Sequence, residues 1–200
     1  MSPLITPKVF GIGFHKTGTT SLADALTLLG YEVTGPNGVR HRGMDRETAW
    51  RSASRLLSQF DAFQDNPWPL LYREIDLELP GSKFVLTVRP EAEWLRSVVH
   101  HFGRESTPMR EWIYGVGTPL AHEDLFLERY RRHNQAVADY FDGRHEDLLI
   151  MEITRGHGWN MLCPFLGHPI PEVQFPHSNP ALNRSRMGRP MVRLRRRMSR

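Results

Sequence analysis

Apolar side chains recur along this chain in short runs that alternate with longer amphipathic stretches. The runs with the length and content of buried strands are residues 8–14, 31–35, 61–65, 83–89 and 148–153. Apolar residues at helical spacing predict helices over residues 22–29, 45–60, 70–79, 90–103, 123–141 and 159–166. Strands that are separated by helices indicate an α/β fold with a central, mainly parallel sheet.

The most apolar of these runs, KFVLTVR at residues 83–89, is typical of a central strand that helices cover on both faces. Pro90 follows it at the first position of a helix, where its missing N–H does no harm. Two other segments are predicted to lack regular structure. Residues 104–122 are either a flexible lid or a passive loop, and residues 164–180, rich in proline, form a closing loop on the surface.

The positive charge of the chain, a formal net +4, is concentrated at its C-terminal end. Residues 184–200 contain eight arginines and no acidic residue, so residues 1–183 carry a net charge of −4. We therefore divide the chain into one domain, residues 1–183, and an Arg-rich tail, residues 184–200. We interpret the tail as a solvated terminus rather than a site for RNA or an anionic membrane, and we expect no nucleic-acid partner.

Cys163 is the only cysteine, which excludes the disulfide-rich secreted class and a thiolate zinc cluster within one chain. No apolar run is long enough to span a bilayer, and the N-terminus lacks the basic and apolar regions of a signal peptide. We therefore expect a cytoplasmic protein without a membrane span. The sequence leaves the oligomeric state open, a homo-oligomer included.

The stretch that points to chemistry is GIGFHKTGTTSL at residues 11–22, between the first predicted strand and the first predicted helix. Backbone N–H groups and a helix dipole hold anions at such a junction. Gly13 and Gly18 would allow a close backbone approach to the anion, and Lys16 adds a cation. The order of residues differs from a Walker A motif and from a dinucleotide fingerprint. A tight structural turn is the alternative.

The Lys-Thr-Gly-Thr-Thr sequence after a strand resembles the 5′-phosphosulfate loop of sulfotransferases that use 3′-phosphoadenosine 5′-phosphosulfate (PAPS). A second block, TVRPEAEWLRSV, has an Arg at a strand end and a Ser eight residues later, as that family has for the 3′-phosphate of the donor. The segments FDAFQDNPW, PGSKFVLTVR, GWNMLCPFLGHPIP and FPHSN are also similar to a microbial and eukaryotic subfamily, so the resemblance spans about residues 9–179.

The resemblance implies a P-loop NTPase-like α/β sandwich of three layers. It also implies a donor site that consists of His15, Lys16, Thr17, Gly18, Thr19, Thr20, Ser21, Arg89 and Ser97. Two positions depart from the family pattern. His15 stands where proline is common, and Ser21 stands where many relatives have a tryptophan that stacks on adenine.

In-line sulfuryl transfer depends on positioning and on charge stabilisation, and Lys16 suits the departing phosphate. An acceptor hydroxyl usually needs a base, for which Asp65 at a predicted strand end is our first choice. Asp65 alternatively caps the turn that Asn66-Pro67 begins. The other candidate bases are His15, His41, His100 and His101. We expect no metal, because no acid suits a magnesium site beside this loop.

The sequence therefore predicts a PAPS-dependent sulfotransferase that acts on an acceptor hydroxyl. The acceptor is a small molecule, a glycan or a lipid, and the sequence does not choose among them. Two alternatives remain: a small P-loop kinase or related nucleotide-binding enzyme, and a non-catalytic protein that binds nucleotides or nucleic acid.

Overall fold

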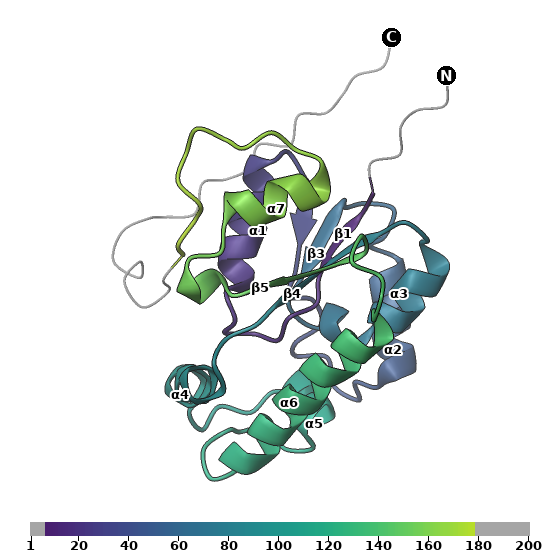
Figure 1. Cartoon of the computed structure of the whole chain (residues 1–200). Coiled ribbons are helices and arrows are strands. Elements are labelled where there is room, and N and C mark those ends of the chain that lie inside the picture. Colours follow the sequence, from purple (N-terminus) through teal and green to yellow (C-terminus); the bar gives the residue numbers. More distant parts are fainter. Residues whose placement is uncertain (1–6, 179–200) are drawn as a thin grey trace, which may run out of the picture.

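The computed structural model describes residues 7–178, so the predicted tail and the domain boundary at residue 183 lie outside the described residues. A parallel sheet forms the centre of the molecule (Figure 1). Its strand order is β2-β3-β1-β4-β5. The strands are β1 (Val9–Gly11), β2 (Val33–Thr34), β3 (Ala62–Gln64), β4 (Lys83–Thr87) and β5 (Leu148–Met151).

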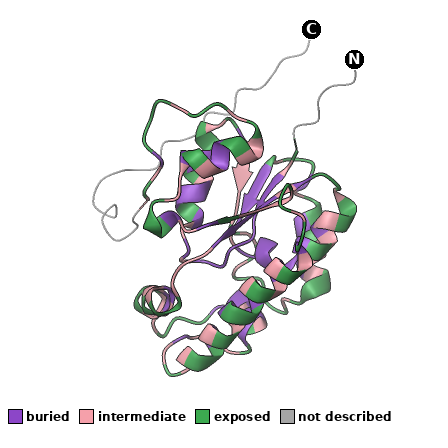
Figure 2. Ribbon diagram, viewed as in Figure 1, coloured by how far each residue is buried: buried purple, intermediate pink, exposed green. Residues whose placement is uncertain are grey.

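Helices pack on both faces of this sheet (Figure 1). One face is covered by α2 (Arg46–Ser54), α3 (Tyr72–Glu78) and part of α6 (Glu123–Tyr140), and the other by α1 (Thr19–Leu28) and α7 (Trp159–Leu166). The two faces have separate buried apolar clusters, and the residues that form the strands are mostly buried (Figure 2). The three layers confirm the predicted α/β class.

Phe10, Phe63 and Phe84 show how strand register builds the core. They occupy paired positions on β1, β3 and β4. The ring of Phe10 lies 4.7 Å from that of Phe63 and 5.7 Å from that of Phe84, centroid to centroid. Because neighbouring parallel strands repeat the same spacing, residues far apart in the sequence form one row of aromatic rings.

The segment from 104 to 122, predicted as a lid or loop, contains the helix α5 (Pro108–Tyr114). Thr107 caps this helix by accepting a hydrogen bond from the N–H of Arg110. Met109, Ile113 and Tyr114 are buried in a third cluster with Trp94 and Tyr130, which lie on α4 (Glu91–Phe102) and on α6. The loop prediction is therefore wrong for the centre of this segment, because one short helix between glycines and prolines leaves too little periodicity to detect.

Other element boundaries shift by a few residues. The helix predicted over 45–60 ends at Ser54, and α1 begins at Thr19 rather than at Leu22. The helix after β4 begins at Glu91, and Pro90 is its cap residue. Two short 3₁₀ helices, η1 (Trp68–Leu70) and η2 (Ile153–Arg155), follow β3 and β5.

The closing segment after α7 is partly integrated into the fold. Residues 164–166 belong to α7, and the rest of the described segment has no helix or strand, as predicted. However, Phe175 is only 9% exposed, and its ring packs against Trp159. Further along, Ser178 lies against α1, because its main-chain N–H donates to Ser21 Oγ at 3.0 Å. The segment is therefore more than a surface loop.

No helix within residues 7–178 is long and apolar enough to cross a bilayer.

Candidate functional site

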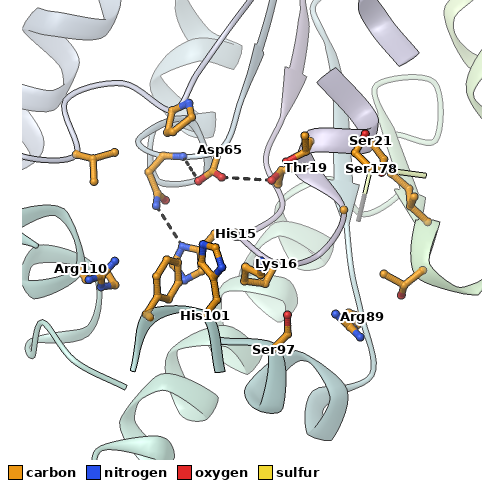
Figure 3. A pocket seen from close by; sticks show the side chains of 18 of the residues that line it. His15, Lys16, Thr19, Ser21, Asp65, Arg89, Ser97, His101, Arg110 and Ser178 are labelled. Carbon is orange, nitrogen blue, oxygen red and sulfur yellow. Dashed lines mark hydrogen bonds between the residues drawn. The ribbon is translucent and has the colours of Figure 1, made fainter. Parts of the chain in front are cut away.

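A cavity of about 580 Å³ lies at the carboxyl ends of the strands (Figure 3). Such an edge is the usual ligand site of an open parallel sheet. The segments around it are the β1–α1 loop, the ends of β3, β4 and β5, helices α4 and α5, and the closing segment. Of the predicted site residues, it is lined by His15, Lys16, Gly18, Thr19, Thr20, Ser21, Asp65, Arg89 and Ser97.

The β1–α1 loop is held in place by its contacts with β4. A Cβ atom at Gly13 would lie 2.1 Å from Thr87 Oγ1, so glycine is required there by the strand rather than by a ligand. Gly18 has φ +105° and precedes the first residue of α1. Lys16 has φ +66°, a conformation that only a few per cent of non-glycine residues adopt and that often marks a functional site.

The four hydroxyl residues of the loop do not share one environment. Thr17 is fully buried, and its hydroxyl contacts Phe14 O and, at 2.6 Å, Thr87 Oγ1. The Thr17 side chain therefore fixes the loop and does not line the cavity. Thr19, Thr20 and Ser21 form the first turn of α1 and do line it.

Arg89 and Ser97 lie on the same wall of the cavity, one after β4 and the other on α4 (Figure 3). The Arg89 Nε atom is buried and makes no hydrogen bond to any residue between 7 and 178, although Glu93 Oε2 lies 3.6 Å away. The Tyr130 hydroxyl accepts from Arg89 N and donates to Arg89 O, both at 2.9 Å. This pair of bonds fixes the backbone from which the guanidinium extends.

Asp65 follows β3, as predicted, and has φ +58°. Its Oδ1 accepts from Asn66 N at 2.7 Å, and its Oδ2 accepts from the Thr19 hydroxyl at 3.2 Å. Burial raises the pKa of Asp65, although these hydrogen bonds and the charge of Lys16 act in the opposite direction. Asp65 thus makes the bond expected of a turn residue, and it also faces the cavity beside the loop (Figure 3).

His15 is 4% exposed. Its Nδ1 lies 3.2 Å from Asn66 Nδ2, and its Nε2 lies 2.9 Å from the Tyr114 hydroxyl. Burial and the positive charges of Arg110 and Lys16 lower the pKa of His15 to about 3. A neutral ring with both nitrogens engaged is suited to joining the loop, the β3 turn and α5, and it is poorly suited to accepting a proton.

The remaining histidines differ in their position. His41, His100 and His101 are all exposed, but only His101 lines the cavity. The cavity therefore brings together Asp65, His15 and His101 of the five bases proposed from the sequence. Between residues 7 and 178, no group of three or more His, Cys, Asp or Glu side chains is placed to hold a metal ion.

Lys16 divides the cavity into two sides (Figure 3). On one side lie Ser21, Arg89, Ser97 and Ser178. On the other side lies Arg110, a buried residue of α5. The lining residues near Arg110 in the sequence, Phe102, Thr107 and Met109, and those of the β2–α2 segment, Pro36 and Val39, are largely apolar.

Two comparisons with known proteins place this fold and cavity in a family. The family model described as the sulfotransferase domain matches residues 8–124 and 118–183. This chain belongs to the sulfotransferase domain family. It is also similar to Ava biosynthesis cluster protein M of Aspergillus versicolor, with 24% identity over 211 aligned residues. That alignment covers 85% of this chain and 80% of the relative.

The sulfotransferase domain contains cavity residues that the sequence analysis did not identify. His177 and Ser178 reach the loop because Ser178 donates to Ser21 and to Asp24. Arg110 lines the cavity because it lies on α5, which contacts the loop where the Tyr114 hydroxyl lies 2.9 Å from His15 Nε2. The Phe-Pro-His-Ser segment resembles the family, but no local pattern in the sequence assigns it a role in the site. No motif or residue spacing in the sequence points to Arg110.

Proposed function

We propose that this sulfotransferase domain transfers a sulfuryl group from PAPS to the hydroxyl group of an acceptor. One observation carries the proposal: Lys16, the first turn of α1, Arg89 and Ser97 all line one cavity. Main-chain N–H groups at a helix start, a lysine and an arginine suit a ligand with several anionic groups.

The residues fit such a donor. Arg89 has a buried Nε without a hydrogen-bond partner among residues 7–178, so its guanidinium retains capacity to bind a phosphate. Gly18 and Lys16, which both have positive φ, bend the loop backbone at the start of α1. Ser21 is too small to stack on a base, and His177 and Ser178 beside it are the candidates for contacts with the nucleoside.

The bound donor supplies an activated sulfuryl group on a good leaving phosphate. Lys16 is proposed to stabilise the negative charge that grows on the bridging oxygen as the sulfur–oxygen bond breaks. Asp65 is proposed to accept the proton of the attacking hydroxyl, since its raised pKa keeps it basic enough for this transfer. The new sulfur–oxygen bond forms on the acceptor, and the phosphate leaves with the electron pair.

Asp65 is a better base than His15 on two grounds. The pKa of His15 is about 3, so this ring has little affinity for a proton. Both of its nitrogens are also engaged, with Asn66 and with Tyr114. A ring nitrogen has no second lone pair, whereas each oxygen of Asp65 keeps one beside its hydrogen bond. His101 is the second candidate base, because it lines the same cavity.

Calorimetry with 3′-phosphoadenosine 5′-phosphate, AMP and ATP tests the donor. We expect the bisphosphate to bind without magnesium, and at least tenfold more tightly than AMP, because a charge-assisted contact to the second phosphate contributes about 1.5–3 kcal/mol. Transfer of labelled sulfate from PAPS in the presence of a chelator then tests the reaction. Tighter binding of ATP with magnesium would favour the P-loop kinase, and no nucleotide binding would favour a non-enzymatic role.

We also expect a cytoplasmic protein whose partner is a small molecule, a glycan or a lipid that carries the acceptor hydroxyl.

A further inference from the structure

Arg110 is an unusual residue to find in the wall of this cavity. It is 5% exposed, and arginine side chains are rarely so buried unless an acid pairs with them. No carboxylate between residues 7 and 178 lies within 4.0 Å of its guanidinium. Burial accordingly lowers the pKa of Arg110.

The contacts that Arg110 makes within the described part of the chain include no paired carboxylate, although the charge of Glu105 raises its pKa against the effect of burial. Its Nε donates to Gly117 O at 2.9 Å, and its Nη2 donates to Glu105 O. Both acceptors are neutral carbonyls. The guanidinium carbon also lies 4.3 Å from the centroid of the Phe102 ring. These contacts orient the group, but they supply no full negative charge.

The acids nearest in the sequence are engaged elsewhere. The Glu105 carboxylate pairs with Arg40 at 3.0 Å. The Glu111 carboxylate accepts from the Ser106 hydroxyl at 2.7 Å. Removing a cation from water is energetically unfavourable, and an anion that arrives with a ligand would offset that cost.

The position of Arg110 indicates which ligand brings this anion. Figure 3 places Arg110 and Arg89 on opposite sides of Lys16. In an in-line transfer the acceptor approaches from the side opposite to the leaving group. If the donor occupies the Arg89 side, the acceptor enters on the Arg110 side, beside the apolar side chains of Val39, Phe102 and Met109.

We propose that the acceptor is an apolar molecule that carries a carboxylate in addition to its hydroxyl group, and that Arg110 binds this carboxylate. The inference rests on the proposed function for the side from which the acceptor enters. It narrows the acceptor class from any alcohol or phenol to a hydroxy acid with an apolar body.

Matched acids and amides test this inference on the full chain. The probes are para-coumarate and para-hydroxyphenylpropionate, each compared with its primary amide, and binding is measured by calorimetry with 3′-phosphoadenosine 5′-phosphate at saturation. Each amide keeps the phenol and the ring but lacks the charge. We expect at least one acid to bind about tenfold more tightly than its amide, as for one charge-assisted hydrogen bond.

Variants then assign the difference to Arg110. Arg110→Gln is expected to remove the preference for the acid, and Arg110→Lys is expected to retain part of it. The matched control is Arg129→Gln. Arg129 Nε donates to Ile113 O at 3.0 Å, and its guanidinium lies 5.5 Å from the Phe14 ring, but Arg129 does not line the cavity. A purely structural role for Arg110 predicts that both glutamine variants lower the melting temperature and leave the preference for the acid intact.

The outcomes separate the two proposals. Equal affinity of every acid and its amide in the wild-type protein overturns the inference, whether or not Arg110→Gln folds. Retention of the preference in a folded Arg110→Gln protein overturns it as well. Failure of 3′-phosphoadenosine 5′-phosphate to bind overturns the proposed function instead, and the acid and amide are then compared on the free protein, where a preference that depends on Arg110 still supports an anion site.

Discussion

The two sides of the cavity are built in different ways. The side with Arg89 consists mainly of the β1–α1 loop, the first turn of α1 and the end of β4, which are directly attached to the central strands, and it is completed by Ser97 of α4 and Ser178 of the closing segment. The side with Arg110 is assembled from residues 36–39 after β2 and residues 101–110 around α4 and α5. The first side is polar, whereas the second combines the apolar side chains of Val39, Phe102 and Met109 with His101, Thr107 and the buried Arg110.

This difference concerns how each side is held in place. Buried contacts fix the Arg89 side: Thr17 against Thr87, and Trp94, whose ring lies 4.1 Å from Tyr130 and whose Nε1 donates to His15 O. The Arg110 side depends on a seven-residue helix and on loops. Substitutions on the Arg89 side should therefore impair donor binding or turnover, and those on the Arg110 side should change acceptor preference.

The largest expected effect comes from Lys16, between the two sides. Lys16→Ala should abolish measurable transfer, with a loss of at least about 10³-fold, because it removes the cation proposed to stabilise the leaving phosphate. Rates with labelled PAPS and the melting temperature check this. Lys8→Ala is the control, since Lys8 donates to Phe60 O and does not line the cavity. Unchanged turnover in Lys16→Ala would remove Lys16 from the mechanism.

Asp65→Asn is next. If Asp65 is the base, turnover should fall by about 10²- to 10⁴-fold while donor affinity stays the same. The amide oxygen can still accept from Asn66 N, so a role in the turn alone predicts nearly full activity. Stability at neutral pH should not fall, because the substitution removes a carboxylate whose ionisation burial disfavours.

The pH dependence of the wild-type rate gives the same test without a substitution. A base works in its deprotonated form, so the rate should fall as the pH drops through the pKa of Asp65. Burial raises that pKa, so the loss should begin at a higher pH than for an ordinary aspartate, whose pKa is about 3.9. This fall in rate at low pH should be absent from the residual activity of Asp65→Asn. If the fall persists in that variant, a group other than Asp65 titrates.

On the Arg89 side, Arg89→Ala and Ser97→Ala should weaken binding of 3′-phosphoadenosine 5′-phosphate more than they slow the bound complex. A phosphate that does not react contributes mainly uniform binding. We expect a loss of about 10- to 100-fold in Arg89→Ala, and a smaller loss in Ser97→Ala. AMP affinity should change little, and Arg132→Ala, an exposed substitution on α6, should leave both affinities unchanged. A preserved preference for the bisphosphate would place the second phosphate elsewhere.

Tyr130→Phe should have a smaller effect on the same affinity. It removes the hydroxyl that bonds to both main-chain polar groups of Arg89 but keeps the ring that stacks on Trp94. We expect affinity for the bisphosphate to fall about three- to tenfold, as for the loss of a neutral hydrogen bond. Tyr72→Phe is the matched control, because its hydroxyl donates to Ala136 O and Tyr72 does not line the cavity. If Tyr130→Phe and Tyr72→Phe lower the affinity for the bisphosphate equally, the cause is a general effect on stability.

The smallest effect is expected on the Arg110 side. Val39 is a half-buried residue of the cavity wall. Val39→Ala should therefore weaken the binding free energy of an apolar acceptor by about one kcal/mol at most. The acceptor KM should rise by up to about fivefold, while the affinity for 3′-phosphoadenosine 5′-phosphate should stay within about twofold. Steady-state kinetics with either phenolic acid and calorimetry measure the two quantities. A larger loss of nucleotide affinity than of acceptor affinity would mean that the two sides are not separable.

Much of the Arg89 side was predictable because its signals are local. The loop joins a strand to a helix within residues 9–28, and Arg89 and Ser97 are separated by one strand end and two helical turns. Even here, packing corrected the details. The sequence treats the hydroxyls of Thr17, Thr19 and Thr20 alike, but contact with Thr87 turns the Thr17 hydroxyl away from the cavity.

The sequence by itself determined the alternation of strands and helices, the glycine-containing loop between the first strand and the first helix, and the position of Asp65 at a strand end. Only the tertiary structure decided that α5 forms, that the closing segment reaches Ser21, that His15 is neutral and that Arg110 lies across Lys16 from Arg89. The physical reason is the range of the interactions. A turn or a helix depends on neighbours a few residues away, whereas burial, pKa and charge compensation depend on side chains that the fold brings together from distant parts of the chain.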